Sequence, residues 1–276
     1  MVAFIFALGW STGQIIFLGA FFAVVAIIVV TLAASALRTL RAMKTDQADA
    51  IRWKSDFHDL SPAARTCRHE FTGEFKHRVC SNDFDCNVCE QHAKLVADHA
   101  AAPVQANVQV SPGFTLPLDR LYHRGHTWTK QDPDGTYIIG IDDFAARLIG
   151  TPDSIDLPPI GKRLSANGSA WNFMKGDATV RLLSPIAGEV VGTSDGTEGW
   201  YVRVKPLSAA VPTGHLLRGN EVAPWIQREF ERLQNFLADP KIGFTLPDGG
   251  VPITDFSAAF PEKDWEAIYA SLLLEP

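Results

Sequence analysis

The chain has 276 residues and a formal net charge of −6. A nucleic-acid-binding domain normally presents a basic face, so this acidic balance argues against a nucleic-acid partner. Seven Trp and 17 Phe supply enough large apolar side chains for one or two packed domains.

The N-terminal segment is apolar and long enough to cross a membrane. Residues 1–37 contain no charged side chain, and Ile15–Leu37 is almost wholly apolar. As a helix, Ile15–Leu37 spans about 34 Å, against a hydrocarbon core of about 30 Å. A cleaved signal peptide would need a positive start and a shorter apolar core, so a retained anchor is favoured. We therefore expect an extramembrane N-terminus over residues 1–14 and a single transmembrane helix over residues 15–37.

The charges that follow the span predict its orientation. Arg38, Arg41 and Lys44 come directly after it, and no Lys or Arg precedes it. Because positive residues tend to stay on the cytoplasmic side, we expect an inner (cytoplasmic) membrane protein with its C-terminal domain in the cytoplasm. Residues 38–60 are interpreted as a polar continuation of the helix at the membrane surface.

All four cysteines fall within residues 61–99, which we interpret as a small Cys-rich metal-binding module. Their spacing is C-x12-C-x5-C-x2-C, formed by Cys67, Cys80, Cys86 and Cys89. A C-x2-C pair can place two thiolates on one ion, and a second pair can complete a tetrahedral site. Three histidines are close enough in sequence to act as substitute ligands, namely His69, His77 and His92.

Several readings of these cysteines remain open. Cytoplasmic thiols stay reduced, which favours a metal site over disulfides. Zinc and an iron–sulfur cluster both accept four thiolates, and the spacing matches no common ferredoxin pattern. Zinc is the leading interpretation, an iron–sulfur cluster is the alternative, and free thiols or disulfides are the third. If the domain were periplasmic, two disulfides would lead.

Residues 100–118 are rich in Ala, Pro and Val, and we interpret them as a linker. Short alternating apolar runs split by turn signals follow from Leu121, with a short helix possible over residues 142–148. Regularly spaced short strands predict a β-barrel or β-sandwich over residues 119–206. The fold class is therefore α+β, with a transmembrane helix, a Cys-rich module, a lipoyl-type β domain and C-terminal helices.

The β domain resembles the glycine-cleavage H-protein, a relative of biotinyl and lipoyl domains. The matching sequence words, in chain order, are Tyr122-His123-x-x-His126-x-Trp128, Asp134-Gly135, Gly140-Ile141-Asp142-Asp143-Phe144-Ala145, Asp156-Leu157-Pro158-x-x-Gly161, Ser184-Pro185-Ile186-Ala187-Gly188-Glu189-Val190-Val191 and Gly199-Trp200. The resemblance implies a flattened β-barrel or sandwich of two small sheets. It also implies a hairpin that carries the lipoyl lysine in true carriers, and structural roles for His123 and His126.

This chain departs from the family at the lipoyl lysine. Counting back from Pro185, the lysine position falls on Asp177. Lys175 is two residues early and lacks the acidic and small neighbours of the family word. We therefore interpret Lys175 as a solvated turn residue, with lipoylation of Lys175 as the alternative. Lipoate is not expected as a cofactor.

Residues 207–276 are interpreted as a helical C-terminal extension. The apolar residues of Asn220–Leu237 recur at three- and four-residue steps, which predicts an amphipathic helix with Asn220 as its cap and Pro224 in its first turn. Pro261–Leu274 predicts a last short helix. Its Leu-rich end could pack onto the domain or bind a partner.

These features suggest a non-enzymatic protein, since no catalytic residue set stands out. We expect a membrane-anchored scaffold or accessory subunit of an integral-membrane complex, by analogy of layout a respiratory or photosynthetic one. The alternative is a redox or lipoyl carrier, using a cysteine-bound iron–sulfur cluster or lipoylated Lys175.

Overall fold

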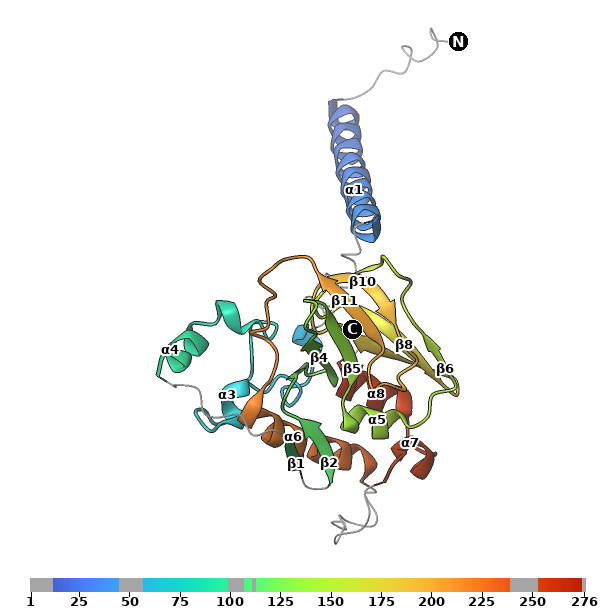
Figure 1. Cartoon of the computed structure of the whole chain (residues 1–276). Coiled ribbons are helices and arrows are strands. Elements are labelled where there is room, and N and C mark those ends of the chain that lie inside the picture. Colours follow the sequence, from blue (N-terminus) through green and yellow to red (C-terminus); the bar gives the residue numbers. More distant parts are fainter. Residues whose placement is uncertain (1–11, 45–56, 99–106, 111–112, 239–252, 275–276) are drawn as a thin grey trace. The chain divides into compact units, whose positions relative to one another are not determined.

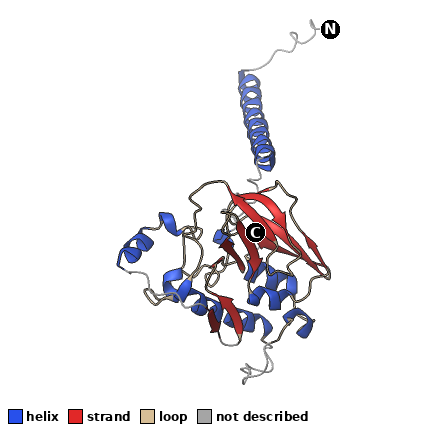
Figure 2. Cartoon of the chain, viewed as in Figure 1, coloured by secondary structure: helices blue, strands red, loops and turns tan. Residues whose placement is uncertain are grey.

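The structure is a computed structural model that describes residues 12–44, 57–98, 107–110, 113–238 and 253–274. The chain divides into two units, Met1–Ala48 and Asp49–Pro276. Each is described by itself. Figure 2 shows one unbroken helix in the first unit and a mixture of short strands and short helices in the second.

The N-terminal unit contains helix α1, Thr12–Lys44. Its window Thr12–Leu37 has the length and the composition needed to cross a membrane. Large apolar side chains of this window are exposed rather than packed into a core; Ile16 and Phe17 are each 68% exposed. The helix continues past the predicted end of the span as far as Lys44, and the rest of the predicted juxtamembrane helix up to residue 56 lies outside the described residues.

The second unit begins with the part that holds the cysteines, residues 57–98, here called the cysteine segment. Its elements are short: η2 Phe57–Asp59, α3 Arg68–Phe71, η3 Cys86–Val88 and α4 Glu90–Asp98. The described part of this segment buries few apolar side chains, among them Phe57, Phe71 and Phe84. A segment with so small a core needs other interactions to hold its shape.

The predicted linker contains a β-hairpin, which corrects that interpretation. Strands β1, Asn107–Val110, and β2, Phe114–Pro117, pair antiparallel. Phe114 and Leu116 are almost fully buried in the main core. The two apolar residues were too few to stand out against the Ala- and Pro-rich surroundings, but their burial gives the hairpin a core face. Residues 99–106 lie outside the described part.

The β domain consists of two antiparallel sheets. The six-stranded sheet has the order β3-β4-β5-β11-β10-β7, and the three-stranded sheet has the order β6-β8-β9. The strand bounds are β3 Leu121–Tyr122, β4 Thr127–Gln131, β5 Tyr137–Ile141, β6 Ser154–Asp156, β7 Arg163–Leu164, β8 Ser169–Lys175, β9 Ala178–Leu183, β10 Gly188–Thr193 and β11 Val202–Pro206. Buried and exposed positions alternate along β10 and β11, so each strand presents one face to the core. The predicted two-sheet β domain is present.

Three helices complete the core together with α5, Asp143–Ile149. They are α6 Val222–Leu237, α7 Phe256–Ala259 and α8 Trp265–Leu273, with η4 Gly219–Glu221 leading into α6. Helix α6 contacts β1, and α8 contacts β9 and α6 (Figure 1). The predicted C-terminal helices are therefore part of the same hydrophobic core as the sheets.

The ends of these helices differ from the predictions in detail. Asn220 does not cap α6, because it lies inside η4 and Glu221 occupies the N-cap position. Helix α8 begins at Trp265 and is capped by Asp264, whose carboxylate accepts a hydrogen bond from the Ala267 N–H. The Leu-rich end of α8 packs onto the domain, since Leu272 and Leu273 are fully buried.

Candidate functional site

The resemblance to H-protein predicts that a carrier lysine would lie at the tip of the β8–β9 hairpin. The strands pair as far as Lys175 and Ala178, which leaves Gly176 and Asp177 as a two-residue turn. Gly176 has a φ of +58°, a left-handed conformation that glycine adopts without strain. Both turn residues are exposed, so the residue at the tip is Asp177. A carboxylate cannot form the amide that attaches lipoate.

Lys175 is held against the protein, which corrects its interpretation as a solvated turn residue. Its Nζ donates a hydrogen bond to the Thr151 carbonyl at 2.7 Å and lies 3.1 Å from Asp255 Oδ2. Asp255 also caps α7 by accepting from the Ala258 N–H at 2.9 Å. Burial would raise the pKa of Asp255, but these hydrogen bonds lower it. The amine is therefore engaged in an ion pair.

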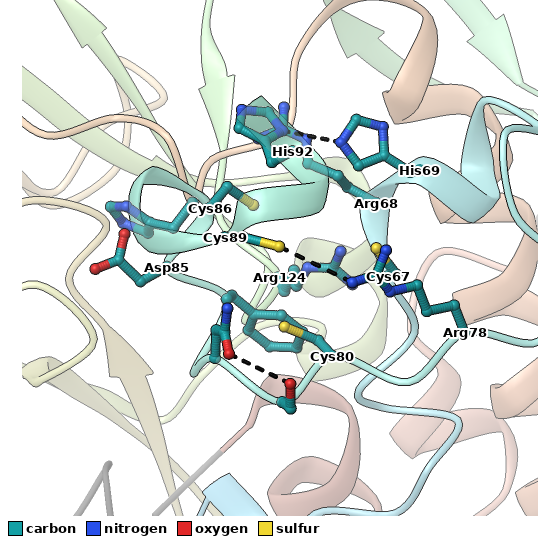
Figure 3. A pocket seen from close by; sticks show the side chains of 14 residues that line it. Cys67, Arg68, His69, Arg78, Cys80, Asp85, Cys86, Cys89, His92 and Arg124 are labelled. Atoms are coloured by element: carbon teal, nitrogen blue, oxygen red, sulfur yellow. Dashed lines mark hydrogen bonds between the residues drawn. The ribbon is translucent and has the colours of Figure 1, made fainter. Parts of the chain in front are cut away.

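The four cysteines line one pocket in the cysteine segment, here called the thiol pocket (Figure 3). Cys67 and Cys80 flank an antiparallel bridge between Thr66 and Val79, and the Cys67 N–H donates to the Arg78 carbonyl at 2.8 Å. Cys86 and Cys89 are joined by a tight turn in which the Cys89 N–H donates to the Cys86 carbonyl at 3.2 Å. Residues from two separate turns thus converge on the pocket.

The sulfur atoms are gathered but not joined. All four cysteines are free thiols. Within the ranges that the structure describes, no three His, Cys, Asp or Glu side chains are arranged to hold a metal ion as they stand. The cavity between them measures about 30 Å³, which is enough for one ion or water molecule. Burial raises the pKa of the Cys67 and Cys86 thiols, so an ion would have to displace protons to bind them.

Two of the three candidate histidines reach the pocket. His69 and His92 line it, and their ring nitrogens lie 2.9 Å apart. Burial lowers the pKa of both rings, which favours their neutral form. His77 is exposed and is not among the pocket residues.

Three arginines line the thiol pocket, and no local sequence pattern predicts their presence there (Figure 3). Arg68 and Arg78 belong to the cysteine segment, and Arg124 comes from the loop between β3 and β4. Arg68 makes a two-pronged ion pair with Glu221, through Nε at 2.6 Å and Nη2 at 2.5 Å. The cysteines lie 35 to 57 residues before Arg124, and no local pattern connects them, so only the closed fold reveals that they share a pocket.

A buried cluster of ionisable side chains lies at the other end of the β3–β4 loop. The His126 ring is stacked between Phe144 and Trp225, with centroid distances of 4.5 and 4.8 Å. Its Nδ1 lies 2.8 Å from Asp142 Oδ2, and its Nε2 lies 3.9 Å from Glu229 Oε2. The His126 and Asp142 side chains are fully buried, so this cluster links β4, α5 and α6 rather than meeting a substrate.

Comparison with known proteins identifies one segment of the chain. Residues 120–228 match the family model for glycine cleavage H-protein. The glycine cleavage system H protein of Enterobacter sp. (strain 638) is 27% identical over 108 residues, which cover 34% of this chain and 84% of that protein. The corresponding protein of Shewanella frigidimarina (strain NCIMB 400) is 29% identical over 105 residues, with coverages of 33% and 81%. Residues 120–228 are therefore an H-protein-like segment, as the resemblance predicted, and the match extends beyond residue 206 into α6.

A solved structure is also similar to this chain. The crystal structure of a glycine cleavage system H protein from Mycobacterium marinum has 24% sequence identity and a TM-score of 0.36, covering 41% of this chain and 99% of that one.

Proposed function

We propose that this protein is a non-enzymatic, membrane-anchored scaffold or accessory subunit that has kept an H-protein fold without its carrier chemistry. The observation that carries the proposal is the β8–β9 hairpin. Its tip residue is Asp177, and the nearby Lys175 amine is tied to Thr151 and Asp255. A lysine in that position cannot serve as a freely swinging arm while those contacts last.

The rest of the chain supports a scaffold role. Helices α6 and α8 and the β1–β2 hairpin share one core with the sheets, which enlarges the H-protein-like segment on several sides. Helix α1 has the composition of a membrane anchor, and the basic residues after it favour a cytoplasmic position for the C-terminal domain. We place the protein in the inner membrane, associated with an integral-membrane complex. The analogy to respiratory or photosynthetic subunits rests on this layout alone.

The proposal is tested by two questions: whether Lys175 carries a lipoyl group, and whether the protein needs Lys175 to bind its partners. The protein is purified from native membranes, its intact mass is measured, and the co-purifying proteins are identified. We expect no lipoyl mass, and Lys175→Ala should retain the same partners. Lys162→Ala, at a position in the same domain that is half-buried like Lys175, is the matched control. Lipoate on Lys175, or loss of function in Lys175→Ala alone, would establish the carrier alternative instead.

We also propose that Cys67, Cys80, Cys86 and Cys89 bind one metal ion, with zinc favoured. Four thiols on two turns line a common cavity, and two pairs of cysteines from separate turns are the donor set that a tetrahedral zinc site uses. Elemental analysis should return about one metal per chain, lost in a Cys86→Ser/Cys89→Ser variant. Visible absorbance with iron content would favour the iron–sulfur alternative, and two disulfides in non-reducing mass spectrometry would refute metal binding.

A further inference from the structure

Arg124 is a buried cation that lacks a carboxylate partner. It is 6% exposed, and no hydrogen bond or ion pair joins its guanidinium to another residue in the described ranges. The guanidinium carbon lies 4.1 Å from the ring centroid of Phe84 and 5.1 Å from that of Phe71. The buried carboxylate of Glu229 is influenced by Arg124 but pairs with Arg232. A buried charge without an anion is costly, so this arrangement calls for a negative partner.

The groups that face Arg124 are thiols. Arg124 lines the thiol pocket together with Cys67, Cys80 and Cys86, and Figure 3 shows it lying among the cysteines of that pocket. Asp85 also lines the pocket, but it is exposed and caps η3 by accepting from the Asn87 N–H, so a deprotonated thiol is the group that would supply the missing negative charge. Metal coordination deprotonates thiols outright, so it would provide that charge at neutral pH.

The charges of the pocket fit such a centre. A divalent zinc ion with four thiolates carries a formal charge of minus two. Arg68 is already neutralised by Glu221, which leaves Arg78 and Arg124 as the two lining arginines whose guanidinium has no carboxylate partner among the described residues. The Arg78 Nη2 lies 4.0 Å from the Cys89 Sγ. One doubly negative centre would therefore be balanced by two cations.

We propose that Arg78 and Arg124 are the counter-charges of a metal–thiolate centre, and that Arg124 couples metal loading to docking of the cysteine segment on the H-protein-like segment. The inference rests on the metal site proposed above. Arg124 belongs to the H-protein-like segment, whereas all four thiols belong to the cysteine segment. Two ion pairs, Arg68–Glu221 and Arg228–Glu70, already join these two segments without a metal. Metal loading would add a further attraction between Arg124 and the thiolates.

The first test measures zinc affinity of the full-length protein in detergent, by competition with a chromophoric chelator. Arg124→Met keeps a stem that can pack on Phe84 but removes the charge, and we expect zinc affinity to fall about 10- to 100-fold, as for other residues that support metal ligands. Arg124→Lys should recover part of the loss. The matched control is Arg120→Met, since Arg120 also lies 4.1 Å from an aromatic centroid, that of Trp128, but pairs with Asp119.

The second test separates a counter-charge from a merely structural role. Thermal unfolding is followed with zinc and with excess chelator. In chelator, Arg124→Met should be as stable as the wild type or more stable, because a buried unpaired cation has been removed. With zinc it should be less stable than the wild type. Equal destabilisation in both conditions, or wild-type zinc affinity in Arg124→Met, would overturn the proposal. If Arg124→Met fails to fold, Arg78→Met and Arg124→Lys test the same charge dependence.

Failure of the metal itself is distinguishable from failure of the scaffold role. A wild-type protein that binds neither zinc nor cadmium would refute both the metal site and the role of Arg124. The scaffold proposal would stand in that case, because it depends on the state of Lys175 and on the partners that co-purify.

Discussion

The Nδ1 of His126 lies 2.8 Å from Oδ2 of Asp142, and both side chains are fully buried. Burial alone would lower the pKa of His126, but the Asp142 and Glu229 carboxylates together outweigh it and raise the pKa to about 9. The same carboxylate group caps α5 by accepting from the Ala145 N–H at 2.8 Å. This pair therefore connects the β3–β4 loop to the helix that follows β5.

The raised pKa makes the stability of the domain depend on pH. The pKa of His126 is about 9 in the folded state and about 6.5 when unfolded, so its contribution is fully present below pH 6.5 and is lost as pH rises through 9. That contribution is about 3 kcal/mol at most. The free energy of unfolding of wild type and His126→Gln should differ more at pH 6 than at pH 10. A pH-independent difference would contradict the assignment.

His123 provides the control for that experiment. It is equally buried, but burial lowers its pKa to about 3, so it stays neutral over the same range. Unfolding below about pH 6.5 protonates His123, so the difference between wild type and His123→Gln should change in the opposite direction to that of His126→Gln, by less than about 1 kcal/mol between pH 6 and pH 10. Denaturant titrations at several pH values measure both variants in the same way.

Substitutions of Arg68 and Glu221 should have strongly non-additive effects on the free energy of unfolding. The two side chains are 3% and 10% exposed, so Arg68→Met leaves a buried carboxylate without its cation. We expect a loss of about 3–5 kcal/mol in the free energy of unfolding, partly recovered in an Arg68→Met/Glu221→Leu double variant. The exposed Lys130–Asp119 pair is the control, and Lys130→Met should cost less than about 1 kcal/mol. Additive effects of the two substitutions would show that Arg68 and Glu221 act independently.

Two tryptophans of the β domain should differ in their effect on stability. Trp171 is 1% exposed and stacks on Tyr201 at 5.4 Å, so Trp171→Ala should cost about 3–5 kcal/mol. Trp200, which belongs to the Gly199-Trp200 word of the resemblance, is only partly buried and donates its indole N–H to Glu198. Trp200→Ala should therefore cost clearly less. Equal losses in urea denaturation would mean that Trp200 packs more tightly than its exposure indicates.

The orientation in the membrane can be tested with protease. The basic residues that follow the span predict that residues 38–276 lie in the cytoplasm. Protease added outside intact spheroplasts should leave this region uncut, and lysis should make it accessible. Cleavage of intact spheroplasts would reverse the topology and would favour disulfides over a metal at the cysteines.

Local sequence patterns predicted the elements whose signals lie within a few residues of one another. The apolar run before Arg38 predicted a long helix, and the three- and four-residue spacing around Trp225 predicted α6. The words around Tyr122 and Ser184 indicated the H-protein-like segment, and the register of that resemblance put Asp177 at the lysine position. The two helix predictions succeed because backbone geometry imposes its periodicity locally.

Only the tertiary structure decided which polar side chains meet. Lys175 pairs with a carboxylate 80 residues away, and Arg68 pairs with one 153 residues away. The hairpin of residues 107–117 was interpreted as a linker, because the burial of Phe114 depends on α5 and α6 rather than on its neighbours in the chain. Arg124 likewise lines the thiol pocket only because folding brings together residues that are distant in the sequence. The partner of a buried charge is set by which surfaces exclude water together, and no local pattern in the sequence specifies that.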